Sequence, residues 1–179
     1  MLESFRMNVG LWLARRKFKK AKADVVSFVG AVSGARRALV IMPLDRRELL
    51  SAMNVIEMLK KTFDEEHVTV VGDERGMETL RLMPKSHFVQ IKEDDVTRVF
   101  HPRKEFLTRL KGTSFDLAID LNLDLVLPSA YICRESNARV RVGFAGPNAD
   151  SFFNFQIQPD PTRSRSDIYD RVAKCLHMF

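Results

Sequence analysis

The sequence predicts an α/β protein with a single doubly wound parallel sheet, preceded by a basic N-terminal helical arm. From residue 38 onward, short β-rich runs alternate with helical stretches, which is typical of a parallel sheet covered on both faces. At 179 residues the chain has room for one such domain with a core. Residues 1–37 hold nine Lys and Arg against two acids, so they carry +7 while residues 38–179 carry −1 of the total of +6. We therefore expect an arm over residues 1–37 and a domain over residues 38–179.

The arm has the pattern of a basic amphipathic helix or helical pair. Large apolar residues recur in it at helical spacing: Leu2, Phe5, Val9, Trp12 and Leu13. Such a helix can lie on an anionic membrane, because aromatic rings settle at the headgroup level and cations are attracted by the negative leaflet. It can equally pack its apolar stripe on the domain or on a partner protein. The residues expected to make these contacts are Phe5, Trp12, Arg15, Arg16, Lys17, Lys19 and Lys20.

The domain is expected to contain six strands and five helices. The expected strands cover residues 38–42, 67–71, 87–91, 115–121, 139–144 and 152–158, and the expected helices cover residues 47–62, 74–83, 102–111, 124–135 and 167–178. The first strand, ALVIM, is apolar throughout, as expected of a strand buried on both faces. Pro128 is expected either in the first turn of its helix, where a missing backbone N–H does no harm, or at a kink in that helix.

Composition and motifs argue against several functional classes. The basic residues lie in the arm and are not spread over a folded face among stacking aromatics, so we expect no nucleic-acid partner. Cys133 and Cys175 lack a CxxC spacing and the four histidines show no ligand spacing, so we expect neither a metal nor another cofactor. A nucleotide-binding domain is disfavoured because neither a P-loop nor G-x-G-x-x-G is present. Export or organellar import are alternatives, since residues 25–32 weakly imitate a signal peptide and the N-terminus is rich in Arg.

Residues 38–56, ALVIMPLDRRELLSAMNVI, resemble the opening of a family 9 glycosyltransferase, the group that includes lipopolysaccharide heptosyltransferases. In that family the first strand is followed by the turn L-D-R-x-G-D, and here the same register has Leu44, Asp45, Arg46, Arg47 and Glu48. The Gly-Asp pair is thus replaced by Arg47-Glu48. Residues 115–146, with their Asp-Leu repeats and a Gly-Phe pair, and residues 163–179 are similar to later parts of the same family domain.

The resemblance implies a Rossmann-like domain that forms the acceptor side of a two-domain transferase. The family's Asp is its expected catalytic base, so Glu48 is the candidate for that role here. In parallel sheets, ligands bind outside the carboxyl ends of the strands where the strand order reverses. With the first and fourth strands adjacent, the two turns there converge, and the candidate acceptor-binding residues are Asp45, Arg46, Arg47, Asp120 and Asn122, with Asp124 nearby. For the acids, helix capping is the competing interpretation.

The expected function is that of a glycosyltransferase-like half-domain that is not catalytic alone, because transfer needs donor and acceptor held together in one cleft. It is expected to act as a binding or scaffold subunit, cytoplasmic and peripheral on the inner membrane, or within a protein complex. The alternative is the acceptor-binding subunit of a split glycosyltransferase. In that case a partner chain with a nucleotide-sugar-binding domain supplies the sugar for a lipopolysaccharide-type acceptor.

Overall fold

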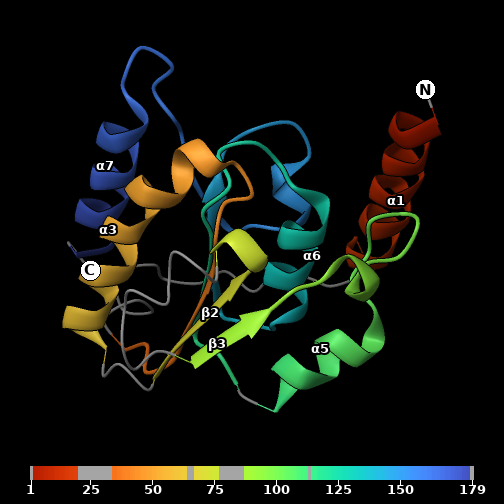
Figure 1. Cartoon of the computed structure of the whole chain (residues 1–179), viewed down its shortest axis with the longest axis horizontal. Coiled ribbons are helices and arrows are strands. Elements are labelled where there is room, and N and C mark those ends of the chain that lie inside the picture. Colours follow the sequence, from red (N-terminus) through yellow and green to blue (C-terminus); the bar gives the residue numbers. More distant parts are fainter. Residues whose placement is uncertain (1, 20–33, 64–66, 77–86, 113, 178–179) are drawn as a thin grey trace.

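The computed structural model describes residues 2–19, 34–63, 67–76, 87–112 and 114–177 (Figure 1). The helices are α1 (Leu2–Phe18), α3 (Arg46–Thr62), α5 (Lys104–Lys111), α6 (Leu127–Glu135) and α7 (Arg165–His177). The strands are β1 (Ala38–Ile41), β2 (Val68–Gly72), β3 (His87–Gln90), β4 (Leu117–Asp120), β5 (Val140–Phe144) and β6 (Phe155–Ile157). The described residues also include the short 3-10 helices η2 (Glu93–Asp95) and η3 (Ala149–Ser151).

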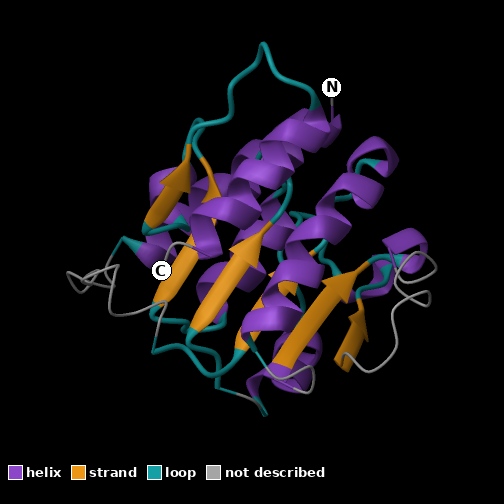
Figure 2. Ribbon diagram, turned by 90° about the vertical axis from the view of Figure 1, so that its left-hand side faces the viewer, coloured by secondary structure: helices purple, strands orange, loops and turns teal. Residues whose placement is uncertain are grey.

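The six strands form one sheet in the order β3-β2-β1-β4-β5-β6, and every pair is parallel (Figure 2). The strand order reverses between β1 and β4, where Ile41 lies beside Asp120. This is the Rossmann-like order. The predicted doubly wound parallel sheet is therefore confirmed, as is the adjacency of its first and fourth strands.

Helices cover both faces of the sheet. Alternate residues of β1 point to opposite sides: Val40 belongs to the core beneath α3 and α7, whereas Leu39 and Ile41 belong to the core beneath α1, α5 and α6. All four residues of β1 are buried, which explains its uniformly apolar sequence. The two apolar cores hold the ends of β1 and β4 in fixed positions for the site described below.

The predicted elements differ from the observed ones mainly at their ends. The helix expected from residue 124 begins at Leu127, because Pro128 fits only the first helical turn. The last strand is limited to Phe155–Ile157, because η3 occupies the chain just before it. Of the helix expected over residues 74–83, residues 74–76 are helical and the rest lies outside the described residues.

Helix α1 packs against the domain beside α6 and η3. The residues of α1 that face the domain are Met7, Gly10, Leu11, Ala14 and Phe18. They are not the predicted apolar stripe: Leu2, Phe5, Trp12 and Leu13 are exposed, and Val9 is half-buried. Within the described residues, no helix combines the length and the apolar character that crossing a bilayer requires.

Candidate functional site

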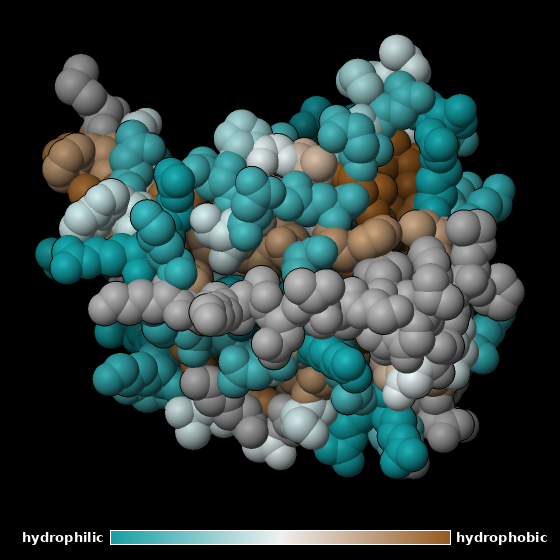
Figure 3. Space-filling model, turned by 180° about the vertical axis from the view of Figure 1, so that it is seen from behind, coloured by the Kyte–Doolittle hydropathy of each residue, from teal (hydrophilic) through white to brown (hydrophobic). Residues whose placement is uncertain are grey.

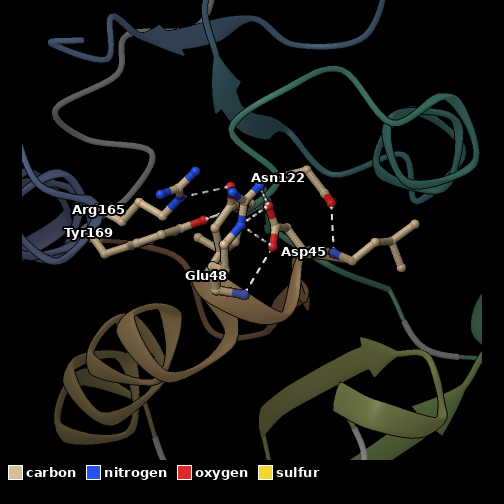
Figure 4. A network of polar contacts seen from close by, with 8 residues as sticks. Asp45, Glu48, Asn122, Arg165 and Tyr169 are labelled. Carbon is tan, nitrogen blue, oxygen red and sulfur yellow. Dashed lines mark hydrogen bonds and ion pairs between the residues drawn. The ribbon is translucent and has the colours of Figure 1, made fainter.

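The candidate site lies at the crest of the sheet, by which we mean residues 42–48 after β1 and residues 120–124 at the end of β4. The crest brings together Asp45, Glu48 and Asn122, and α7 adds Arg165 and Tyr169 (Figure 4). These side chains reach one another because parallel neighbours such as β1 and β4 end at the same edge of the sheet. The described cavities of about 210 and 470 Å³ lie elsewhere, between α5 and α6 and beside β3.

Asp45 is the N-cap of α3, and its carboxylate is held by the second residue of the helix. Oδ1 accepts a hydrogen bond of 2.9 Å from the backbone N–H of Arg47. The guanidinium of Arg47 donates to both carboxylate oxygens, from Nε at 3.0 Å to each and from Nη2 at 2.5 Å to Oδ2. These hydrogen bonds from Arg47 lower the pKa of Asp45 to about 2. The carboxylate therefore stays ionised, and much of its hydrogen-bonding capacity is used by Arg47.

Arg46 differs from its neighbour Arg47. Both side chains are exposed, but no hydrogen bond or ion pair joins the side chain of Arg46 to any other described residue. An exposed guanidinium without such a partner can bind a phosphate or a carboxylate through two parallel hydrogen bonds. Asp124, on the β4 side of the crest, is exposed as well.

Glu48 points away from the open crest and into the interface between α3 and α7. The residue is only 6% exposed. Its Oε2 lies 3.1 Å from the hydroxyl of Tyr169, and its Oε1 lies 3.6 Å from Nε of Arg165. Burial raises the pKa of Glu48, while the Tyr169 hydroxyl works in the opposite direction. A first-turn acid would ordinarily face solvent at the N-terminus of its helix, and this one instead joins two helices.

Tyr169 is fully buried and ties α7 to the end of the sheet. Its hydroxyl lies 2.6 Å from the carbonyl oxygen of Leu121 and 3.1 Å from the carboxyl group of Glu48. A phenol has one hydrogen and donates to one of these acceptors at a time. The hydroxyl is the donor in both contacts, so the Leu121 carbonyl and the Glu48 carboxyl group share its one hydrogen. Burial and the neighbouring Glu48 raise the pKa of Tyr169, so the phenol keeps its proton.

Asn122 links the ends of β1 and β4. Its Oδ1 accepts from the backbone N–H of Leu44 at 3.0 Å, and its Nδ2 donates to Oδ1 of Asp120 at 2.6 Å. The backbone N–H of Asn122 donates to the same Asp120 oxygen at 3.1 Å. Both residues are buried. Through these buried hydrogen bonds, Asp120 and Asn122 connect the end of β4 to the turn after β1.

Burial raises the pKa of Asp120 to about 7, against the opposite effect of the two hydrogen bonds from Asn122. No described cation pairs with Asp120, so the neutral form is favoured up to that pH. The described residues also contain no group of three His, Cys, Asp or Glu side chains that could hold a metal ion.

Sequence reasoning did not assign a role to Tyr169 or Arg165. Both lie in α7, more than 100 residues after Glu48, and helical periodicity gives no sign of which crest residue they meet. The one available signal was the resemblance of residues 163–179, with their Arg and Tyr, to a family segment.

No family model and no curated protein matches this sequence. Solved structures do match. E. coli heptosyltransferase WaaC with ADP has a TM-score of 0.62 at 15% identity, over 78% of this chain and 46% of that one. A family 9 glycosyltransferase from Veillonella parvula has a TM-score of 0.61 at 18% identity, over 80% and 42%. The E. coli enzyme with ADP-2-deoxy-2-fluoro heptose has 0.62 at 15% identity, over 80% and 49%.

The likeness is one of fold. The predicted resemblance to family 9 glycosyltransferases is confirmed at that level, and this chain spans less than half the length of the structures it matches. What those proteins bind and transfer bears on this chain only as a basis for the proposal that follows.

Proposed function

We propose that this chain is a glycosyltransferase-like half-domain that does not transfer sugar by itself. It serves as a binding or scaffold subunit, either at a membrane surface or in a protein complex. The proposal rests on the placement of Glu48. A catalytic base must reach the proton it removes, within about 3 Å or through one water. The carboxyl group of Glu48 is buried between α3 and α7 and lies beside Tyr169 and Arg165, so it is poorly placed to meet an acceptor hydroxyl at the open crest.

Turnover of an activated sugar tests this proposal. The purified chain is incubated with ADP-heptose, the donor class suggested by the solved structures, with a heptose-deficient lipopolysaccharide as acceptor. We expect no release of ADP above the buffer control. Release of ADP that is lost in Glu48→Gln, but kept in Glu57→Gln, would show that Glu48 is a catalytic base and would overturn the proposal. Glu57 is a suitable control because it is an exposed acid on the same helix.

A second candidate is the acceptor-binding subunit of a split glycosyltransferase. Arg46 favours it, because this exposed guanidinium at the crest has no partner among the described residues and suits a phosphorylated acceptor. The assay is the same transfer reaction with the assembly purified from its native source. Transfer that is lost in the Glu48→Gln assembly favours the split enzyme, and the absence of any nucleotide-sugar binding in the assembly rules it out.

A further inference from the structure

The two faces of α1 have opposite surroundings. The inner face, defined as Met7, Gly10, Leu11, Ala14 and Phe18, is closed against the domain. Gly10 lies so near the segment before α5 that a Cβ atom there would be 2.0 Å from the carbonyl oxygen of Val99. The carbonyl oxygen of Gly10 lies 2.7 Å from Nε2 of His101. The inner face therefore has little room for any partner other than the domain.

The end of α1 is fixed by an ion pair and by aromatic contacts. Nζ of Lys17 lies 2.5 Å from Glu135 and 2.9 Å from the hydroxyl of Tyr131, both on α6. The ring of Phe18 packs edge-on against Tyr131 at 5.0 Å and Phe152 at 5.9 Å between ring centroids. Lys17, expected from the sequence to face a membrane or a partner, is thus turned toward the domain. Detaching α1 would expose Phe18 and break these contacts.

The outer face of α1 is apolar and cationic. Its large side chains are exposed by 80%, 67%, 57% and 39% at Leu2, Phe5, Trp12 and Leu13. The guanidinium of Arg16 lies over the ring of Trp12, 5.6 Å from its centre. Arg15, Arg16 and Lys19 are exposed, and Glu3 is the single acidic residue of the helix. Figure 3 shows apolar atoms on the surface at the projecting end of the molecule that carries the N-terminal half of α1.

We propose that α1 binds anionic phospholipid with its outer face while its inner face stays docked on the domain. This inference deepens the membrane-surface part of the proposed function and rests on it. A ring such as Trp12 settles at the boundary between headgroups and acyl chains, and neighbouring cations are attracted by anionic headgroups. The exposed cations Arg15, Arg16 and Lys19 outnumber Glu3, the single acid of the helix, and this excess of positive charge favours an anionic surface over a neutral one. Because docking already orders the helix, binding does not require a free arm to fold on the lipid.

Vesicle flotation tests the partner. We expect the full chain to float with phosphatidylglycerol-containing vesicles and to stay unbound with phosphatidylcholine alone, and the binding should weaken as salt rises. The triple variant Arg15→Gln, Arg16→Gln, Lys19→Gln should lose roughly tenfold or more in vesicle affinity. Its matched control removes three exposed charges elsewhere, through Arg139→Gln, Arg171→Gln and Lys174→Gln, and should remain within about twofold of the parent chain.

The apolar contribution is tested by a second matched pair. Phe5→Ser with Trp12→Ser should abolish flotation, whereas Leu44→Ser with Leu50→Ser, two exposed residues near the crest, should not affect it. Binding that is indifferent to lipid charge, or equal losses in test and control variants, would overturn the proposal and point to a protein partner for this face.

A cross-link tests whether α1 stays docked. A carbodiimide joins the amine of Lys17 to the carboxylate of Glu135, and Lys17→Gln serves as the control that cannot be linked. We expect the cross-linked chain to bind phosphatidylglycerol vesicles as tightly as the unlinked chain. Loss of binding on cross-linking would show that α1 must leave the domain, and would overturn docking. These outcomes are independent of ADP release, so a failure here is distinguishable from a failure of the proposed non-catalytic role.

Discussion

The crest and the outer face of α1 place polar and apolar groups in opposite ways. At the crest, polar side chains such as Glu48, Asp120 and Asn122 are buried and contact one another or the backbone. On α1, large apolar side chains such as Phe5 and Trp12 remain in solvent. A buried polar network contributes to the fold when its members are satisfied, whereas exposed apolar groups contribute little to it and are available to a partner. The crest therefore uses its polar groups inside the fold, whereas the outer face of α1 leaves apolar groups in solvent, as the lipid-binding proposal requires.

This contrast implies that substitutions at the crest, or on the inner face of α1, should change the free energy of unfolding. Substitutions on the outer face should leave it within roughly 0.5 kcal/mol. The following substitutions test each side of the contrast.

Gly10→Ala should have the largest effect. The new Cβ would lie 2.0 Å from a backbone carbonyl that cannot rotate away, so α1 must move off the domain and expose Phe18. Losing this burial and that of its inner-face neighbours should lower the free energy of unfolding by about 4 kcal/mol in a urea titration. Gly112→Ala is the control, because among the described residues no heavy atom lies within 4 Å of a Cβ there and the backbone is already helical. Equal stability of the two variants would show that α1 is only loosely placed.

Asp120→Asn should change how stability depends on pH. The folded pKa of about 7 exceeds the ordinary pKa of 3.8 for an aspartate, so the folded state binds the proton more tightly. This contribution to stability is complete below about pH 4 and is lost as the pH rises through about 7. The unfolding free energy of Asp120→Asn relative to the parent chain should therefore increase by roughly 3 kcal/mol between about pH 4.5 and about pH 8.5.

Urea titrations across this pH range measure that difference. Asp124→Asn is the control, since Asp124 is an exposed acid four residues further along the crest. If the free energies of unfolding of the parent chain and of Asp120→Asn depend on pH in the same way, the Asp120 carboxyl group is solvated in the folded protein. The polar network at the crest would then not be buried.

The sheet could be predicted from the sequence because central parallel strands are buried on both faces. Accordingly, β1 is apolar throughout and β4 is apolar up to its last residue, Asp120. The convergence at the crest followed, because adjacent parallel strands end at the same edge. The direction of Glu48 could not be predicted, since it depends on Tyr169 in a helix more than 100 residues away. The docking face of α1 was also missed. Large apolar residues occur on both sides of this helix, and the side that packs on the domain combines them with the small residues Gly10 and Ala14, which periodicity does not mark.

Tyr169→Phe should have an intermediate effect. Removing the hydroxyl leaves the carbonyl oxygen of Leu121 and the carboxyl group of Glu48 without a shared partner in a buried place. An unsatisfied buried polar group costs about 2 kcal/mol, so the urea midpoint should fall with an unchanged slope. A double-mutant cycle with Glu48→Gln separates the two contacts, because a network predicts non-additive losses. Additive losses would indicate that Tyr169 acts through the carbonyl alone.

Glu48→Gln should have the smallest effect on the free energy of unfolding. This substitution distinguishes two possible roles of the Glu48 side chain. If Glu48 acts mainly by accepting the hydrogen bond from Tyr169, glutamine keeps an oxygen in that place and the loss should stay below about 1 kcal/mol. If instead the carboxylate is charged and pairs with Arg165, removing its charge should cost about 2 kcal/mol, because the Arg165 side chain is 43% exposed and water solvates the guanidinium that is left. The raised folded pKa also sets the sign of the pH dependence: the contribution of Glu48 is largest at low pH and declines as the pH rises above 4.5. The stability advantage of the parent chain over Glu48→Gln should therefore shrink on going from acid to neutral pH. An advantage that grows instead would mean that the carboxylate is charged in the folded protein and is stabilised there by Arg165.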